Sequence, residues 1–174
     1  MPENGQTGEP SYPPNAVHMM RTTQLTHFQL SAMADHKASI LMGATFVIFT
    51  ITIGQARGSA APLPLLILGA SAFFSAIFAV LAILPKTRSL RPSGPLNVLF
   101  FGSFTQLSEE EFTDQILSRL KSDDSIYRTM AHDIYQNGMV LQNKKYRLLG
   151  YAYRIFLVGL TASCGAFVVQ YFFT

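Results

Sequence analysis

The residues able to carry chemistry gather in two stretches, each of which leads into a long apolar segment. Lysine and arginine bind phosphate and tyrosine stacks on a base, so their combination suits a small anionic nucleotide. A simpler interpretation is that the charges set membrane topology and cover solvated helix faces. The two stretches contain Asp35, His36, Lys37, Tyr127, Arg128, His132, Asp133, Tyr135, Lys144, Lys145 and Arg147.

Signatures of an enzyme are missing from the sequence. His132-Asp133 matches the adjacent pair of metal-dependent phosphohydrolases, but such sites need further His and Asp ligands. The other histidines, His18, His27 and His36, all lie in the N-terminal region. The chain has no Gly-rich phosphate loop, no Cys and His set at zinc spacing and no nucleophile elbow. We therefore expect a protein that is not an enzyme, with no catalytic residue, no metal and no cofactor.

The composition is typical of a membrane protein. Of the 174 residues, 49% are hydrophobic and only 13% are charged, which argues against an ordinary soluble domain. The apolar residues form three blocks, and about 20 such residues in a helix cross the hydrocarbon core. The sequence predicts an all-α membrane protein with three transmembrane helices, at 38–54, 62–84 and 149–173, and a small, mostly helical cytoplasmic region.

Basic residues flank these blocks and predict the topology. Lys and Arg mark the cytoplasmic side, and the flanking bases are Lys37, Lys86, Arg88, Arg91, Lys144, Lys145, Arg147 and Arg154. The N-terminus and residues 85–148 are predicted to be cytoplasmic, and the C-terminus to lie outside. The bases form no stripe with interleaved aromatics, so no nucleic acid partner is expected. Arg154 is expected to snorkel to the cytoplasmic surface between Tyr151 and Tyr153.

The polar parts of the chain are predicted to be mainly helical. Residues 1–15, rich in Pro, Gly and Asn, are expected to form a disordered tail without the apolar core of a signal peptide. Residues 16–37 are expected to form a membrane-proximal helix that continues into the first span. Ser108 with Glu111 is a capping box, which predicts a helix over 109–121.

Two further segments lie in the cytoplasmic region, 85–148. Asp123 or Asp124 is expected to cap a long helix that runs into the third span and bends at Asn137-Gly138. Residues 97–102, NVLFFG, are too short to cross a membrane. They are expected to form either a strand-like segment or a loop held at the membrane interface by phenylalanines.

Polar and small residues within the spans leave two interpretations open. Thr45 and Thr52 share a helix face, which lines a water-filled path if subunits assemble, or else their hydroxyls bond to carbonyls of their own helix. Small residues on the second helix permit close approach of a helix from the same chain or from another subunit. These residues are Gly69, Ser71, Ser75 and Ala79. Three helices do not readily enclose an aqueous path, so we expect a homo-oligomer.

Three motifs together resemble a known family. They are ADHKASILMG, FFGSFTQLSEEEF and DSIYRTMAHDIYQNGMVLQNKKYRLLGYAY, and the resemblance extends from about Gln24 onward. In order and spacing they resemble the transmembrane effectors of bacterial Pycsar anti-phage systems. The resemblance implies that a partner cyclase senses infection and makes a cyclic pyrimidine mononucleotide, cCMP or cUMP. The effector would then impair the bacterial inner membrane, with the lipid bilayer as its contact.

The resemblance also implies roles for residues at the cytoplasmic surface. Lys144, Lys145 and Arg147 would be the phosphate contacts, and Tyr135 and Tyr146 the base contacts. The coupling point would consist of Asp35, His36 and Lys37. Because the two charged stretches enter the membrane at one level, Asp35 is expected to pair with one of the three bases. The alternative is a non-catalytic membrane anchor or interaction protein that recruits a partner through its cytoplasmic helices.

Overall fold

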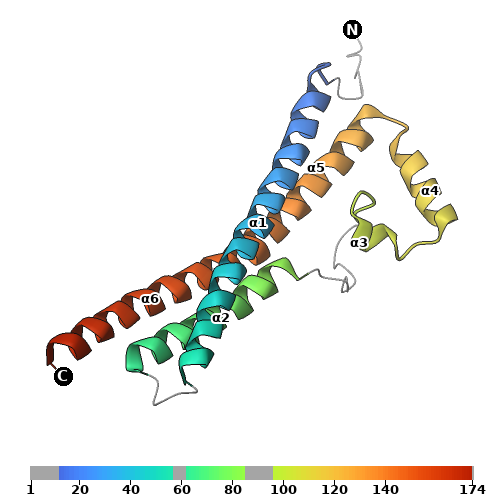
Figure 1. Ribbon diagram of the computed structural model, residues 1–174. Helices are drawn as coiled ribbons and strands as arrows, with labels where there is room; N and C mark the ends of the chain where they lie inside the picture. The colour runs from blue at the N-terminus through green and yellow to red at the C-terminus, as the bar shows by residue number, and fades with distance from the viewer. Residues whose placement is uncertain (1–11, 57–61, 85–95, 174) are drawn as a thin grey trace, which may run out of the picture. The chain divides into compact units, whose positions relative to one another are not determined.

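The described part of the chain is built from helices and contains no strand (Figure 1). The computed structural model describes residues 12–56, 62–84 and 96–173. Three helical runs are long and apolar enough to cross a membrane, namely α1, α2 and the run Asp123–Phe172. The predicted all-α membrane fold is therefore confirmed. The elements are α1 (Ala16–Ala56), α2 (Leu63–Ile83), α3 (Phe101–Phe104), α4 (Glu109–Arg119), α5 (Asp123–Val140), the π-helical segment η1 (Leu141–Tyr146) and α6 (Arg147–Phe173).

Several predictions concern residues outside the described part. These are the tail at 1–11 and the connector over 85–95 with its bases Lys86, Arg88 and Arg91. The membrane boundaries, the cytoplasmic location of residues 85–148 and the orientation of the termini stay predictions.

The chain divides into two compact units. The first comprises residues 1–28 and 85–139, and the second comprises 29–84 and 140–174. α1 contributes to both units because it is continuous over 41 residues, as predicted for a membrane-proximal helix that runs on into the first span. The first unit also holds α3, α4 and α5, and the second holds α2, η1 and α6.

In the first unit, the segment 97–102 forms a turn followed by the start of α3. Asn97 Oδ1 accepts a hydrogen bond from Leu99 N at 3.0 Å, and this Asx-type contact curls the backbone. Asn97 and Val98 are each only 1% exposed. The strand-like alternative is therefore wrong, because the Asn97 side chain captures an amide that a strand would offer to a neighbour.

The start of α4 follows its predicted capping box. Ser108 N donates to Glu111 Oε2 at 2.9 Å, and Glu111 N donates to Ser108 Oγ at 3.2 Å. Two amides at the helix start are thus satisfied reciprocally. The helix ends at Arg119, two residues earlier than the sequence pattern indicates.

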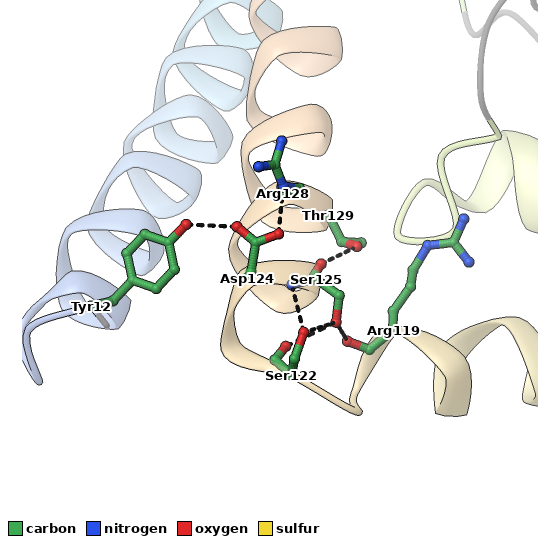
Figure 2. Close-up of polar contacts among 7 residues, drawn as sticks. All are labelled: Tyr12, Arg119, Ser122, Asp124, Ser125, Arg128 and Thr129. Atoms are coloured by element: carbon green, nitrogen blue, oxygen red, sulfur yellow. Dashed lines mark hydrogen bonds and ion pairs between the residues drawn. The ribbon is translucent and has the colours of Figure 1, made fainter. Parts of the chain in front are cut away.

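The start of α5 differs from its prediction. Ser122 caps it, since its carbonyl accepts from Ile126 N at 3.1 Å. Its Oγ also accepts from Ser125 N at 3.3 Å (Figure 2). Asp123 and Asp124 lie inside the first turn, where the positive end of the helix dipole stabilises their negative charge. The expectation that one of them is the cap was wrong because the serine before them already fills that position.

The helical run from α5 to α6 is irregular at η1, and it is regular at Asn137-Gly138, where a bend was expected. Gly138 has a different role in the first unit. A Cβ added to it would lie 3.3 Å from His27 Cε1, so the missing side chain lets the His27 ring of α1 approach α5 closely.

In the second unit, α2 and α6 run side by side and antiparallel (Figure 1). Ser75 Oγ donates to Ala152 O at 2.8 Å, and Ser163 Oγ donates to Pro64 O at 2.7 Å. Between these two bonds, a Cβ on Gly159 would overlap the side chain of Ser71. Small residues therefore set the spacing of the two helices.

Two threonines of α1, Thr45 and Thr52, are buried in the second unit. Thr45 is 1% exposed and Thr52 is 7% exposed. Thr45 Oγ1 donates to Leu41 O at 2.8 Å and Thr52 Oγ1 donates to Ile48 O at 2.9 Å, so both hydroxyls bond to their own helix. A water-filled path lined by this face is thereby contradicted, because the face is buried within the chain.

Each of the four small residues of α2 lies at a helix contact within the chain. Gly69 lies against Thr52 of α1, where an added Cβ would collide with the threonine side chain. Ser71 and Ser75 face α6, and Ala79 is fully buried in a cluster with residues of α1 and α6. Gly69, Ser75 and Ala79 are thereby buried, whereas Ser71 is half-buried.

We predict that Gly159→Ala destabilises the second unit by about 1–3 kcal/mol, because the added methyl group must push α2 from α6. Unfolding of the purified chain in mixed micelles measures this change. Gly165→Ala on the same helix is the matched control, since its added Cβ meets no atom within 4 Å. Equal stability of the two variants would contradict the close contact.

Candidate functional site

An ion pair joins α1 to η1 where α1 enters its apolar part. Lys145 Nζ lies 2.7 Å from both carboxylate oxygens of Asp35 and 2.7 Å from Ser31 Oγ. The Lys145 side chain is 20% exposed and the Asp35 side chain is 45% exposed. Of the three bases expected near Asp35, Lys145 is the one that pairs with it.

The π-helical segment directs successive side chains to different helices of the second unit. Lys144 Nζ donates to Leu84 O at the C-terminal end of α2. A cation is stabilising there because that end of the helix dipole is negative. Lys145 reaches α1, and Tyr146 Oη donates to Leu30 O of α1 at 3.3 Å. π-helical turns occur frequently at functional sites. η1 is thus the segment to which both α1 and α2 are attached.

A cavity of about 340 Å³ lies beside this segment. Lys37, Tyr146, Leu149, Gly150 and Tyr153 line it. Tyr153 Oη donates to Lys37 O at 3.2 Å, which fixes one aromatic ring next to the cation. A Cβ added to Gly150 would meet no atom within 4 Å, so the cavity is open at this position. A cation with two tyrosine rings offers contacts to an anion and to a flat ring.

The sequence located this region only in part. It named Tyr146 and Lys37, whereas Tyr153 was expected only to flank Arg154, and Leu149 and Gly150 were not singled out. The four lining residues of the helical run are spaced by three, four and seven positions, as on one helix face. Reading that periodicity across the predicted membrane boundary at residue 149 would have found them.

The other expected site residues are more dispersed. His36 and Arg147 are exposed in the second unit. Tyr135 belongs to the first unit, where its side chain is 66% exposed. The structure therefore gathers Lys144, Lys145 and Tyr146 on η1 and leaves Tyr135 outside that group.

A buried carboxylate organises the first unit. Asp133 is 6% exposed, and its oxygens accept hydrogen bonds at 3.0 Å from Gln24, 3.0 Å from Asn97 and 2.9 Å from Asn137. These amides join α1, the turn before α3 and α5 to one side chain. Among the described residues no group of three His, Cys, Asp or Glu side chains is placed to hold a metal. Asp133 thus acts here as a structural acceptor.

Asp124, at the start of α5, is held by two further groups (Figure 2). Arg128 Nε lies 2.6 Å from its Oδ2 and Tyr12 Oη lies 2.8 Å from its Oδ1. The hydrogen bonds from Arg128 and then from Tyr12 lower the pKa of Asp124 below its ordinary 3.8. The same bond to Asp124 raises the pKa of Tyr12 above its ordinary 10.0. The centroid of the Tyr12 ring also lies 4.6 Å from the centroid of the Tyr127 ring.

The fold and the site define a helical membrane protein with a ligand-sized cavity beside an ion pair. The Pycsar effector protein domain, PycTM, matches residues 18–172. The chain belongs to this family of anti-phage defence effectors, which is not a known catalytic family. Neither a curated protein nor a solved structure matches the chain. Membership confirms the family resemblance, and with the three apolar helices it supports a membrane location.

We predict that Tyr12→Phe raises the pKa of Asp124 only part of the way to 3.8, because the larger contribution, from Arg128, remains. Asp124 stabilises the contact above pH 3.8, and this is lost as pH falls through its lowered pKa. Tyr12 contributes below pH 10.0, and this is lost as pH rises through its raised pKa. Carboxyl NMR titration measures the first shift, with Tyr135→Phe as control. An unchanged pKa of Asp124 would refute the Tyr12 contact.

Proposed function

We propose that this chain is an effector of the bacterial inner membrane that cCMP or cUMP activates to impair membrane integrity. The observation that carries the proposal is the cavity in which Lys37 lies with Tyr146 and Tyr153. Its volume, about 340 Å³, falls in the range of small-molecule pockets, roughly 300–1,000 Å³. Membership in a family of defence effectors supports the same proposal.

The lining residues suit a cyclic pyrimidine mononucleotide. The Lys37 ammonium donates to the phosphate, and a tyrosine ring stacks on the pyrimidine. The room at Gly150 admits the sugar close to the α6 backbone. Arg147, which is exposed directly after Tyr146, supplies a second cation at the cavity edge. Tyr135 stays a candidate base contact on the first unit.

Ligand binding is coupled to the helices through the ion pair. Lys145 is adjacent to a cavity residue, and a bound phosphate adds negative charge that competes with Asp35 for its ammonium. Weakening that bond frees α1 from η1. The nucleotide shifts the equilibrium only if it binds the freed arrangement more tightly than the paired one. Asp35, His36 and Lys37 form the coupling point in this proposal, and Lys144 keeps α2 attached to η1.

The proposed partner is a pyrimidine nucleotide cyclase that acts through its product. The site must then face the cytoplasm, with the N-terminus and residues 85–148 inside and the C-terminus outside. The proposed active form is a homo-oligomer. Its contacts must use faces other than Gly69, Ser75 and Ala79, because these residues are buried within the chain, whereas Ser71 is half-buried.

The test uses the purified full chain in dye-loaded vesicles. We predict leakage with cCMP or cUMP and none with the linear monophosphates CMP and UMP. Gly150→Leu places an apolar side chain in the cavity from a position where the added Cβ meets no atom within 4 Å, so it should lower nucleotide affinity and leakage at least about ten-fold. Gly165→Leu, which is equally open but lies elsewhere on α6, is the matched control.

Four outcomes would count against this proposal or a part of it. Absence of both nucleotide binding and nucleotide-dependent leakage removes it. Nucleotide binding that Gly150→Leu leaves intact removes the cavity assignment. Binding that survives charge removal at Lys144, Lys145 and Arg147 removes their role as phosphate contacts. Partner recruitment by the cytoplasmic helices without any leakage would favour an interaction protein.

A further inference from the structure

Arg154 is a charged residue in the apolar part of α6, and it is exposed on that helix. No hydrogen bond or ion pair joins its guanidinium to another residue in the described ranges. The predicted spans 38–54, 62–84 and 149–173 contain no Asp or Glu that would neutralise it. An ionisable residue inside a membrane is costly and marks a functional site by default.

The depth of Arg154 follows from the contacts between α2 and α6. Hydrogen bonds pair Ala152 with Ser75 and Ser163 with Pro64. In this antiparallel register, Arg154 lies opposite Phe73. Phe73 is the midpoint of Leu63–Ile83, about 15 Å from either end of that helix at 1.5 Å per residue. Counted from the predicted start of the third span, Arg154 is still about 8 Å inside.

A bilayer whose surface lay at Arg154 itself would leave the last part of α2 in water. Val80, Leu81 and Leu84, which are 43%, 42% and 54% exposed, belong to that part. Burying these apolar side chains in hydrocarbon requires the membrane to extend past Arg154. The side chain of Arg154 must then extend along this part of α2 to reach the cytoplasmic surface, and its snorkelling stays a prediction.

Arg154 also lines an open groove of about 400 Å³ between α2 and α6. The other lining residues are Ile67, Ser71, Ile155, Val158, Gly159 and Ala162. Ser71 Oγ donates to Leu68 O at 2.9 Å, so its polar atom is already satisfied by its own helix. The surface turned to the groove is apolar. A groove of this kind accepts a hydrocarbon chain. Arg154 borders it with the aliphatic stem of its side chain and is the charged residue among those that line it.

We propose that Arg154 and this groove form a binding site for one membrane phospholipid. The acyl chain lies along Val158, Gly159 and Ala162, and the phosphate accepts hydrogen bonds from the Arg154 guanidinium. Charge complementarity selects this occupant, because an unpaired guanidinium in hydrocarbon gains most from a phosphate. The bound headgroup lies deeper than its neighbours, which thins the bilayer beside α6.

The lipid site itself is independent of the proposed nucleotide function, whereas its consequence for leakage rests on that function. An effector that draws headgroups inward needs no enclosed pore to weaken the bilayer. The bilayer defect then begins at Arg154, on a helix that η1 connects directly to the ion pair with Asp35.

Native mass spectrometry of the full, nucleotide-free chain in detergent tests the site. Phosphatidylglycerol is the probe, and diacylglycerol with the same chains is the ligand that lacks phosphate. We expect Arg154→Gln to weaken phosphatidylglycerol binding at least about ten-fold, the range of a hydrogen bond to a charged group. Arg154→Lys should keep part of the binding, and Arg21→Gln, at an exposed position of α1, is the matched control. Excess inorganic phosphate should not displace the lipid.

The proposal is overturned if Arg154→Gln binds phosphatidylglycerol as wild type does, or if diacylglycerol binds equally well. It is also overturned if Arg154→Gln changes the number of subunits and not the lipid retained, since the face would then contact a second copy. In vesicles, Arg154→Gln should reduce nucleotide-triggered leakage while nucleotide binding persists. Loss of nucleotide binding in wild type would instead count against the proposed function and leave the lipid result standing.

Discussion

The ammonium of Lys145 is shared between both oxygens of Asp35 and the hydroxyl of Ser31, at 2.7 Å to each. The pair lies where a long helix changes from polar to apolar, so both charges stay just outside the uncharged stretch. Exposed ion pairs contribute about 0–1 kcal/mol, whereas a largely covered ion left without its partner costs more. Lys145 is the more covered partner, at 20% exposure. Asp35 therefore contributes to the attachment of α1 to η1, together with Ser31 and the bond from Tyr146 to Leu30 O.

The second unit meets two opposing requirements. Close packing of α2 on α6 needs small residues, as Gly159 against Ser71 shows, and it fixes the register of the two helices. That register in turn places Arg154 beside the midpoint of α2. The packing and the charge are thus linked, because sliding the helices to bring Arg154 outward would break the Ser75 and Ser163 hydrogen bonds.

The fold class was accessible to sequence reasoning because its signals are local. Uncharged stretches predict the apolar helices, and the Ser108 capping box predicts the start of α4. The hydrogen bonds to Asp133 leave no local pattern in the sequence, since one of the donors, Gln24, lies 109 residues away. The turn at Asn97 depends on a side chain that competes with the backbone, and the cap at Ser122 was missed because two aspartates follow it.

The candidate site was predictable in kind and not in detail. Charged and aromatic residues near the membrane surface indicated an anion site, and Asp35 was expected to pair with a nearby base. The choice of Lys145 depends on the π-helical turns of η1, for which the sequence carries no simple pattern. The depth of Arg154 depends on the α2–α6 register, which only contacts between distant residues reveal.

The central claim is that the Asp35–Lys145 pair transmits the nucleotide signal, and a charge-swap cycle tests it most directly. Nucleotide-triggered vesicle leakage is measured for Asp35→Lys, Lys145→Asp and the double swap, with membrane insertion checked for each. The account predicts that each single variant alters the nucleotide response and that the double swap restores it at least in part. Single variants that respond as wild type does, or a double swap no better than the singles, would contradict the claim.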